Sequence, residues 1–106
     1  MTNADVLARL GEVISERLKA DPGTSYVASL ATKGHDAVLK KVAEEAAEVL
    51  LASKDGDKLH LIRETADLWF HCMVLLAWHG ARPEEVLEEL ARREGTSGIE
   101  EKSSRG

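Results

Sequence analysis

Apolar residues recur at helical spacing along most of the chain, and breaks rich in Gly, Pro and Asp divide the pattern into segments. A helix has 3.6 residues per turn, so apolar side chains three and four positions apart share one face. The pattern predicts helices over residues 4–20, 25–32, 35–53, 58–79 and 83–93. Alternation at period two, which is typical of half-buried strands, does not occur convincingly. We therefore predict an all-α fold, an antiparallel helical bundle of about five helices.

The fourth predicted helix is apolar almost all the way round, from Leu61 to Trp78. Such a helix either lies at the centre of its fold or is covered by a second subunit, so we expect the bundle to form a homodimer. The last residues, 95–106, are polar and rich in Gly and Ser. We expect residues 1–94 to form one all-α domain and residues 95–106 to form a mobile polar tail.

Composition and charge narrow the possible partners. With 106 residues the chain forms one domain, and its net charge of −5 argues against a nucleic-acid backbone as the main partner. Cys72 is the only cysteine, which excludes an internal disulfide and fits a cytoplasmic location. The longest apolar run, 68–78, contains His71 and is too short to span a bilayer, so we expect no membrane partner.

Two acidic clusters stand inside the long apolar helices and are the candidate functional residues. The first comprises Glu44, Glu45 and Glu48, and the second comprises Glu64 and Asp67. At 100° per residue, each cluster projects from one arc of its helix. If the break at residues 55–57 makes an antiparallel hairpin, four or five carboxylates converge across it, with Glu48 able to face Glu64.

Carboxylates that are partly buried and unpaired cost several kcal/mol, so the clusters indicate a bound cation. A site of several carboxylates without a thiolate is a hard oxygen site, which favours Mg²⁺ and also suits Mn²⁺. Substrate phosphates and water would complete the coordination shell. Such a site can polarise a phosphoanhydride and activate a water molecule.

The first cluster also has a simpler interpretation. Lys40 and Lys41 stand four residues before Glu44 and Glu45, so these pairs can form a solvated, salt-bridged face. The same two lysines are alternatively candidates for binding substrate phosphates. His60 and His71 extend the polar row of the fourth helix, and a capping or hydrogen-bonded core role explains each of them.

The sequence EEAAE (44–48) followed by ETAD (64–67) resembles the EExxE…ExxD signature of the all-α, MazG-like nucleotide pyrophosphohydrolases. Within that superfamily the chain is most similar to the phosphoribosyl-ATP pyrophosphatase family of histidine biosynthesis. The further stretches that carry this similarity are SYVASLATKG (25–34), KKVAEEAAEVLLA (40–52), ETADLWFHCMVLLA (64–77) and SGIEEK (97–102). The resemblance covers nearly the whole chain from about Leu7.

The resemblance implies Mg²⁺-dependent hydrolysis between the α and β phosphates of phosphoribosyl-ATP, which yields phosphoribosyl-AMP and pyrophosphate. It also implies that the helical cores associate as dimers. By family analogy, Glu44 is a further metal ligand or orients the attacking water. The resemblance assigns the metal to Glu45, Glu48, Glu64 and Asp67, and the phosphates to Lys33, Lys40 and Lys41.

Two other functions compete with this one. A house-cleaning pyrophosphatase of the same superfamily, acting on ordinary or damaged nucleoside triphosphates, would use the same acidic signature. A non-catalytic helical interaction module with a salt-bridged acidic face would use none of this chemistry. A substrate panel separates the two enzymes, and the absence of Mg²⁺-linked thermal stabilisation would identify the interaction module.

Overall fold

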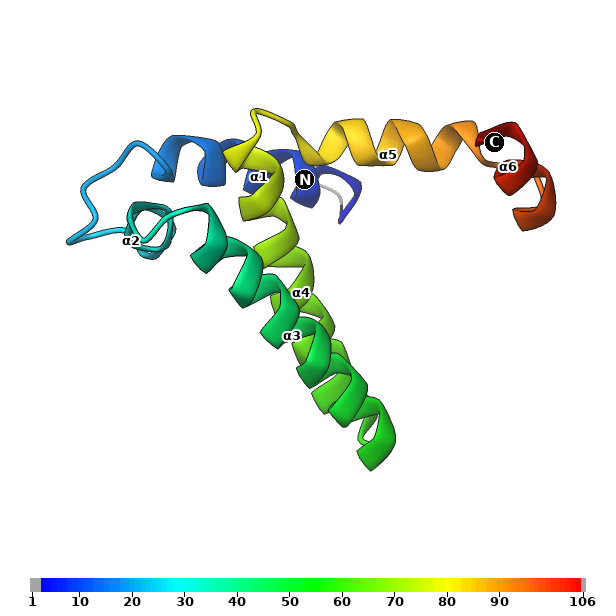
Figure 1. Ribbon diagram of the computed structural model, residues 1–106, viewed down its shortest axis with the longest axis horizontal. Coiled ribbons are helices and arrows are strands. Elements are labelled where there is room, and N and C mark those ends of the chain that lie inside the picture. The colour runs from blue at the N-terminus through cyan, green and yellow to red at the C-terminus, as the bar shows by residue number, and fades with distance from the viewer. Residues whose placement is uncertain (1–2, 106) are drawn as a thin grey trace.

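The computed structural model describes residues 3–105, which form helices and no strand (Figure 1). This confirms the predicted all-α class. None of the described helices has both the length and the hydropathy needed to cross a membrane. The order along the chain is a 3₁₀ turn, Asn3–Asp5, and then α1 (Val6–Arg17), α2 (Tyr26–Thr32), α3 (His35–Asp55), α4 (Lys58–Trp78), α5 (Pro83–Arg92) and α6 (Gly98–Arg105).

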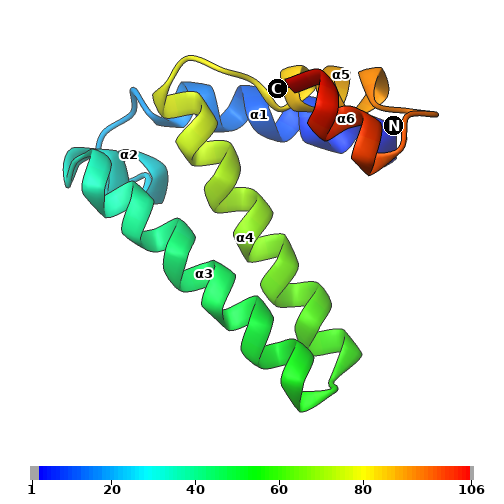
Figure 2. The same cartoon turned by 45° about the vertical axis from the view of Figure 1, so that its right-hand side comes forward.

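A long antiparallel hairpin of α3 and α4 dominates the molecule, and the two helices lie side by side along its length (Figure 2). Gly56 ends α3 in the left-handed region, with φ of 74°, which a residue without a Cβ adopts at little cost. Asp57 then starts α4, because its side chain accepts a hydrogen bond of 3.1 Å from the backbone N–H of His60. The turn therefore reverses the chain within two residues, as the break at 55–57 predicts.

The core lies at the end of the hairpin that is away from this turn, where α1 and α2 meet α3 and α4. Ser25 caps α2 by accepting a hydrogen bond from the Ala28 N–H at 3.1 Å. Gly11 of α1 lies so close to Pro83, the first residue of α5, that there is no space for a larger residue. The buried core side chains come from four helices and are Ile14, Val27, Leu30, Val38, Met73 and Val74.

The rest of the hairpin projects away from this core and exposes apolar side chains. The Cα radius of gyration is 15.7 Å, whereas a compact chain of this length has about 13 Å. The large apolar residues that are more than half exposed include Leu50, Leu51, Leu59, Ile62 and Trp69. The fourth helix, apolar almost all round, is therefore only partly covered within one copy of the chain.

A sixth helix, α6, forms within residues 95–106, the segment expected to be a polar tail. Ser97 and Glu100 form a reciprocal capping box: the Glu100 N–H donates to Ser97 Oγ at 3.1 Å, and the Ser97 N–H donates to Glu100 Oε2 at 3.3 Å. Glu101 is buried and accepts a hydrogen bond of 2.6 Å from Arg92 of α5. The mobility of residues 95–106 stays a prediction.

We predict that Gly11→Ala destabilises the protein although alanine favours helices. A Cβ at this position would lie 2.6 Å from Pro83 Cδ, and the rigid proline ring cannot move aside on its own. Overpacking of this kind costs about 1–3 kcal/mol, which exceeds the helix propensity gained. The melting temperature should fall by about 5 °C or more.

The matched control is Gly98→Ala at the start of α6, where a Cβ would meet nothing within 4 Å. This variant should melt at or slightly above the wild-type temperature. A Gly11→Ala protein as stable as Gly98→Ala would show that α1 and α5 do not pack as described.

Candidate functional site

Carboxylates from both arms of the α3–α4 hairpin come together near the middle of the two helices. Glu45, Glu64 and Asp67 each provide a carboxylate oxygen, and these oxygens all lie within 4.8 Å of one another. We call these three residues the carboxylate group. Glu45 precedes Gly56 by as many residues as Asp67 follows it, so the antiparallel turn places them at the same level. The predicted convergence across a hairpin is therefore observed for three of the five acidic candidates.

The other two acidic candidates, Glu44 and Glu48, lie outside the carboxylate group. Both are on α3 and both are exposed to solvent. The predicted hairpin allows Glu48 to face Glu64, whereas in the structure Glu45 is the residue of α3 that joins Glu64 and Asp67. Glu48 is three residues from Glu45, about 60° round the helix, so it borders the group on its solvent side.

The carboxylate group is the place where burial and charge conflict. Glu45 is only 9% exposed, and its Oε1 lies 3.2 Å from Lys41 Nζ. Glu64 Oε1 lies 3.2 Å from His60 Nε2. These contacts pair two of the three carboxylates with a basic side chain on their own helix. The oxygens that face one another across the hairpin still place like charges close together, which an additional cation would relieve.

The three predicted phosphate-binding lysines differ in their surroundings. Lys41 is half-buried beside Glu45, and its hydrogen bond to that carboxylate raises the pKa of the ammonium group. Lys41 therefore carries a positive charge at neutral pH, directly beside the carboxylate group. Lys40 is exposed on α3, and Lys33 is exposed where α2 ends. The structure thus brings Lys41 to the carboxylate group through its bond to Glu45.

Tyr26 is not among the candidate site residues that the sequence indicates, although it lies in the stretch SYVASLATKG that carries the family resemblance. The structure shows that Tyr26 is 53% exposed and that its hydroxyl lies 2.8 Å from Nε2 of the buried His71. The interpretation of His71 as a hydrogen-bonded core histidine is confirmed, since its Nδ1 also lies 2.8 Å from the Asp67 carbonyl oxygen. The nearest signal in the sequence was the polar row of the fourth helix, which ends at His71.

The donor atoms of the carboxylate group fit a hard divalent cation. All three are carboxylate oxygens, the ligand type that Mg²⁺ and Mn²⁺ prefer, and three ligands from the protein leave positions for water and phosphate oxygens. The charge of Lys41 beside the same group adds a partner for an anionic substrate. Together they can bind a metal–polyphosphate complex.

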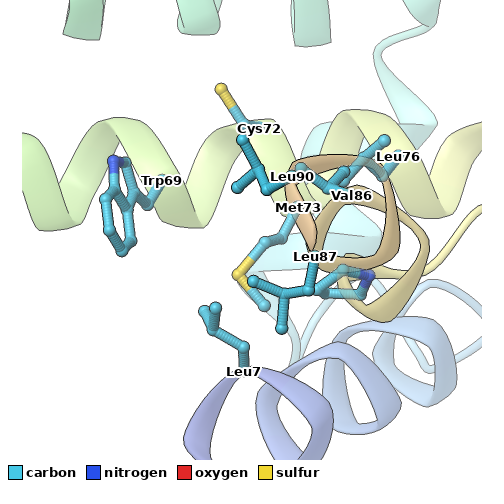
Figure 3. A pocket seen from close by; sticks show the side chains of 9 residues that line it. Leu7, Trp69, Cys72, Met73, Leu76, Val86, Leu87 and Leu90 are labelled. Atoms are coloured by element: carbon cyan, nitrogen blue, oxygen red, sulfur yellow. The ribbon is translucent and has the colours of Figure 1, made fainter. Parts of the chain in front are cut away.

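A separate apolar pocket of about 320 Å³ lies between α1, α4 and α5 (Figure 3). Its lining includes Leu7, Trp69, Cys72, Met73 and Leu87 and contains no charged side chain, so it does not suit a phosphate. Burial raises the pKa of the Cys72 thiol, which keeps this sulfur protonated and a poor nucleophile near neutral pH. The geometry therefore locates the candidate chemistry at the carboxylate group and not in this pocket.

Comparison with known proteins gives a consistent result. The family model described as phosphoribosyl-ATP pyrophosphohydrolase matches residues 7–94. A phosphoribosyl-ATP pyrophosphatase of Chromobacterium violaceum is 65% identical over 101 residues, covering 95% of this chain and 94% of the relative. The corresponding protein of Nitrosospira multiformis is 61% identical, covering 99% of this chain and 87% of the relative. That of an Azoarcus species is 56% identical, covering 99% and 98%.

The resemblance seen in the acidic signature is thus confirmed by a match over most of the chain and by relatives of nearly equal length. The carboxylate group, with Lys41 beside it, lies within the matched segment. The chain belongs to the phosphoribosyl-ATP pyrophosphohydrolase family.

Proposed function

We propose that this protein hydrolyses the bond between the α and β phosphates of phosphoribosyl-ATP and releases phosphoribosyl-AMP and pyrophosphate. This is the second step of histidine biosynthesis, and we assign it to the cytoplasm. The observation that carries the proposal is the convergence of Glu45, Glu64 and Asp67 in a chain of this family. Membership of a family of pyrophosphohydrolases removes the non-catalytic interaction module from the alternatives.

Glu45, Glu64 and Asp67 are the residues that would hold a magnesium ion, with Mn²⁺ as a possible substitute. When bound to such a site, a divalent cation polarises the phosphoanhydride and lowers the pKa of coordinated water. Glu48 is a fourth candidate ligand, because it borders the group on its solvent side. We assign to the exposed Glu44 either a further ligand role or the orientation of the attacking water.

Lys41 contributes a fixed positive charge for the substrate phosphates. One N–H of its ammonium group bonds Glu45 Oε1 at 3.2 Å, and an ammonium group has three N–H donors. The remaining two can donate to phosphate oxygens while the bond to Glu45 holds the nitrogen beside the carboxylate group. Lys40 and Lys33 are exposed, and we assign them to the outer phosphates as mobile point charges.

We also propose that two copies of the chain associate as a homodimer. The support is the row of exposed apolar side chains on the hairpin, together with the apolar pocket beside α5. Soluble monomers rarely expose contiguous apolar patches of this kind, and a second copy would cover them.

The substrate proposal is tested by pyrophosphate release from phosphoribosyl-ATP, ATP and dUTP at equal concentrations, with Mg²⁺ or with a chelator. We expect fast, Mg²⁺-dependent release from phosphoribosyl-ATP and little from the other two. Release from ATP and dUTP instead would identify a house-cleaning enzyme. With Glu45→Gln the rate should fall about 100-fold or more, since even partners of metal ligands contribute 10–100-fold.

The metal proposal is tested by thermal unfolding without substrate. Saturating Mg²⁺ at constant ionic strength should raise the melting temperature of the wild type by about 10 °C, the effect of an ion present at roughly 100 times its Kd. The Asp67→Asn variant should fold normally in the presence of a chelator, but Mg²⁺ should no longer raise its melting temperature. The matched control is Asp55→Asn, an equal charge change beside the turn, which should respond to Mg²⁺ as the wild type does. An unchanged response in Asp67→Asn would exclude Asp67 as a ligand.

The dimer proposal is tested by sedimentation equilibrium. The wild type should sediment at twice the chain mass of 11.6 kDa, and Trp69→Glu, which places a charge on the exposed apolar face, should shift the protein toward monomer. The matched control is Val6→Glu, a similar change on a less exposed position of α1. A wild type that stays monomeric at high concentration would contradict the proposal.

A further inference from the structure

Tyr26 occupies an unusual position, because its hydroxyl is anchored to a buried residue while its ring stays largely exposed. It is the first residue of α2, directly after the capping Ser25. Its hydroxyl lies 2.8 Å from Nε2 of His71 on α4, and the two rings meet edge to face with centroids 5.8 Å apart. The side chain is therefore fixed in place by its polar end, and about half of its surface is free to contact another molecule.

The hydrogen-bond partners of His71 indicate which of its ring nitrogens is protonated and whether the Tyr26 hydroxyl donates or accepts. Its Nδ1 faces the Asp67 carbonyl oxygen at 2.8 Å, and a carbonyl oxygen only accepts, so Nδ1 is the protonated nitrogen. When Nδ1 carries the only ring proton, Nε2 is an acceptor and the Tyr26 O–H donates to it. The Tyr26 oxygen is left with lone pairs that point away from His71 and can accept a hydrogen bond.

His71 connects Tyr26 to the part of α4 that carries the carboxylate group. His71 bonds the main chain of Asp67, a member of the group. The pKa of the Lys41 ammonium group is raised chiefly by its hydrogen bond to Glu45 of the group, lowered by burial, and raised further by electrostatic interaction with Tyr26. The Tyr26 hydroxyl is thus held through His71, which lies one helical turn after Asp67 of the carboxylate group.

We propose that Tyr26 is a substrate-binding residue whose hydroxyl oxygen accepts a hydrogen bond from a ribose hydroxyl of the nucleotide, and that His71 is the positioning residue that orients it. The inference rests on the proposed function, because it takes the phosphates to bind at the carboxylate group and Lys41. The sugar concerned is the ribose that carries the α-phosphate, since it is joined directly to the reacting phosphoanhydride.

The chemistry of the free lone pairs favours a sugar hydroxyl over a phosphate. A phosphate oxygen near neutral pH is chiefly a hydrogen-bond acceptor, so it would face another acceptor at the Tyr26 oxygen. The phosphate finds a hydrogen-bond donor in the Lys41 ammonium group instead. A ribose hydroxyl donates readily and is the donor nearest to the α-phosphate in a nucleotide. The tyrosine ring adds an apolar face at low conformational cost, as tyrosines do in many binding sites.

The test compares wild type and Tyr26→Phe on phosphoribosyl-ATP and on its 2′-deoxy and 3′-deoxy counterparts in the α-phosphate ribose. One hydrogen bond corresponds to roughly a threefold to tenfold effect. The wild type should prefer the full ribose over one of the deoxy substrates by this factor in kcat/KM. In Tyr26→Phe the KM for phosphoribosyl-ATP should rise by the same factor with kcat little changed, and the preference should disappear.

His71→Asn examines the positioning role. Asparagine keeps an N–H donor near the position of Nδ1 but has no atom in place of Nε2, so the Tyr26 hydroxyl loses its fixed orientation. We expect a weakened preference for the full ribose. Combining His71→Asn with Tyr26→Phe should then cause no further loss of that preference.

Ser25→Ala is the matched control for simple destabilisation of α2, because it removes the cap at Ala28 and leaves the Tyr26 hydroxyl in place. This variant should melt earlier but keep the wild-type preference. A Tyr26→Phe enzyme that discriminates as the wild type does, or that loses kcat at unchanged KM, would overturn the inference. A wild type that hydrolyses phosphoribosyl-ATP without any preference would also overturn it. A wild type that releases no pyrophosphate from phosphoribosyl-ATP would instead overturn the proposed function, and this inference with it.

Discussion

The two arms of the α3–α4 hairpin must pack closely while bringing like charges together across their interface. Gly56 and Asp57 form the turn that makes the two arms antiparallel. The number of residues between a side chain and this turn then sets its position along the hairpin. Glu45 and Asp67 stand at equal distances from Gly56 and meet. The remaining helices fix the core end of the hairpin, through the contacts of α1 and α2 with α3 and α4, and so hold the register on which this meeting depends.

The core end of the hairpin and its projecting arms have different roles. The end with the core supplies the buried apolar side chains, and the projecting arms carry the carboxylates together with exposed apolar residues such as Leu50 and Trp69. Tyr26 and His71 link the two parts, since α2 belongs to the core end and His71 bonds the main chain of Asp67. A substrate bound between them would therefore contact the rigid core and the charged arms at once.

Much of the fold could be predicted because local sequence and tertiary structure agree. Ser25, Gly56, Asp57 and Pro83 each have a clear role in starting or ending a helix, and the observed helices begin and end close to the predicted residues. The last helix was missed although a capping box, Ser97 to Glu100, was present in the sequence. The polar composition of the tail outweighed that signal, and the buried ionic contacts of Glu101 with Arg92 depend on tertiary packing that composition does not show.

The candidate site could be predicted in kind but not in detail. Helical periodicity places Glu44, Glu45 and Glu48 on one arc and cannot decide which of them faces the other helix; packing brings Glu45 inward and leaves the other two in solvent. The helical pattern gave no reason to single out Tyr26 as a site residue. Its hydrogen bond to a residue 45 positions later in the chain depends on tertiary contacts between α2 and α4.

We propose that Glu45 of α3 and Glu64 and Asp67 of α4 would hold a divalent cation, which would relieve the repulsion between their charges. The most direct measurement is an anomalous difference map from crystals of this protein grown with Mn²⁺ in place of Mg²⁺. We expect a peak within about 2.2 Å of carboxylate oxygens from both α3 and α4, at Glu45, Glu64 and Asp67. A fully occupied manganese ion elsewhere, or ordered crystals with no peak between the arms at saturating Mn²⁺, would contradict it.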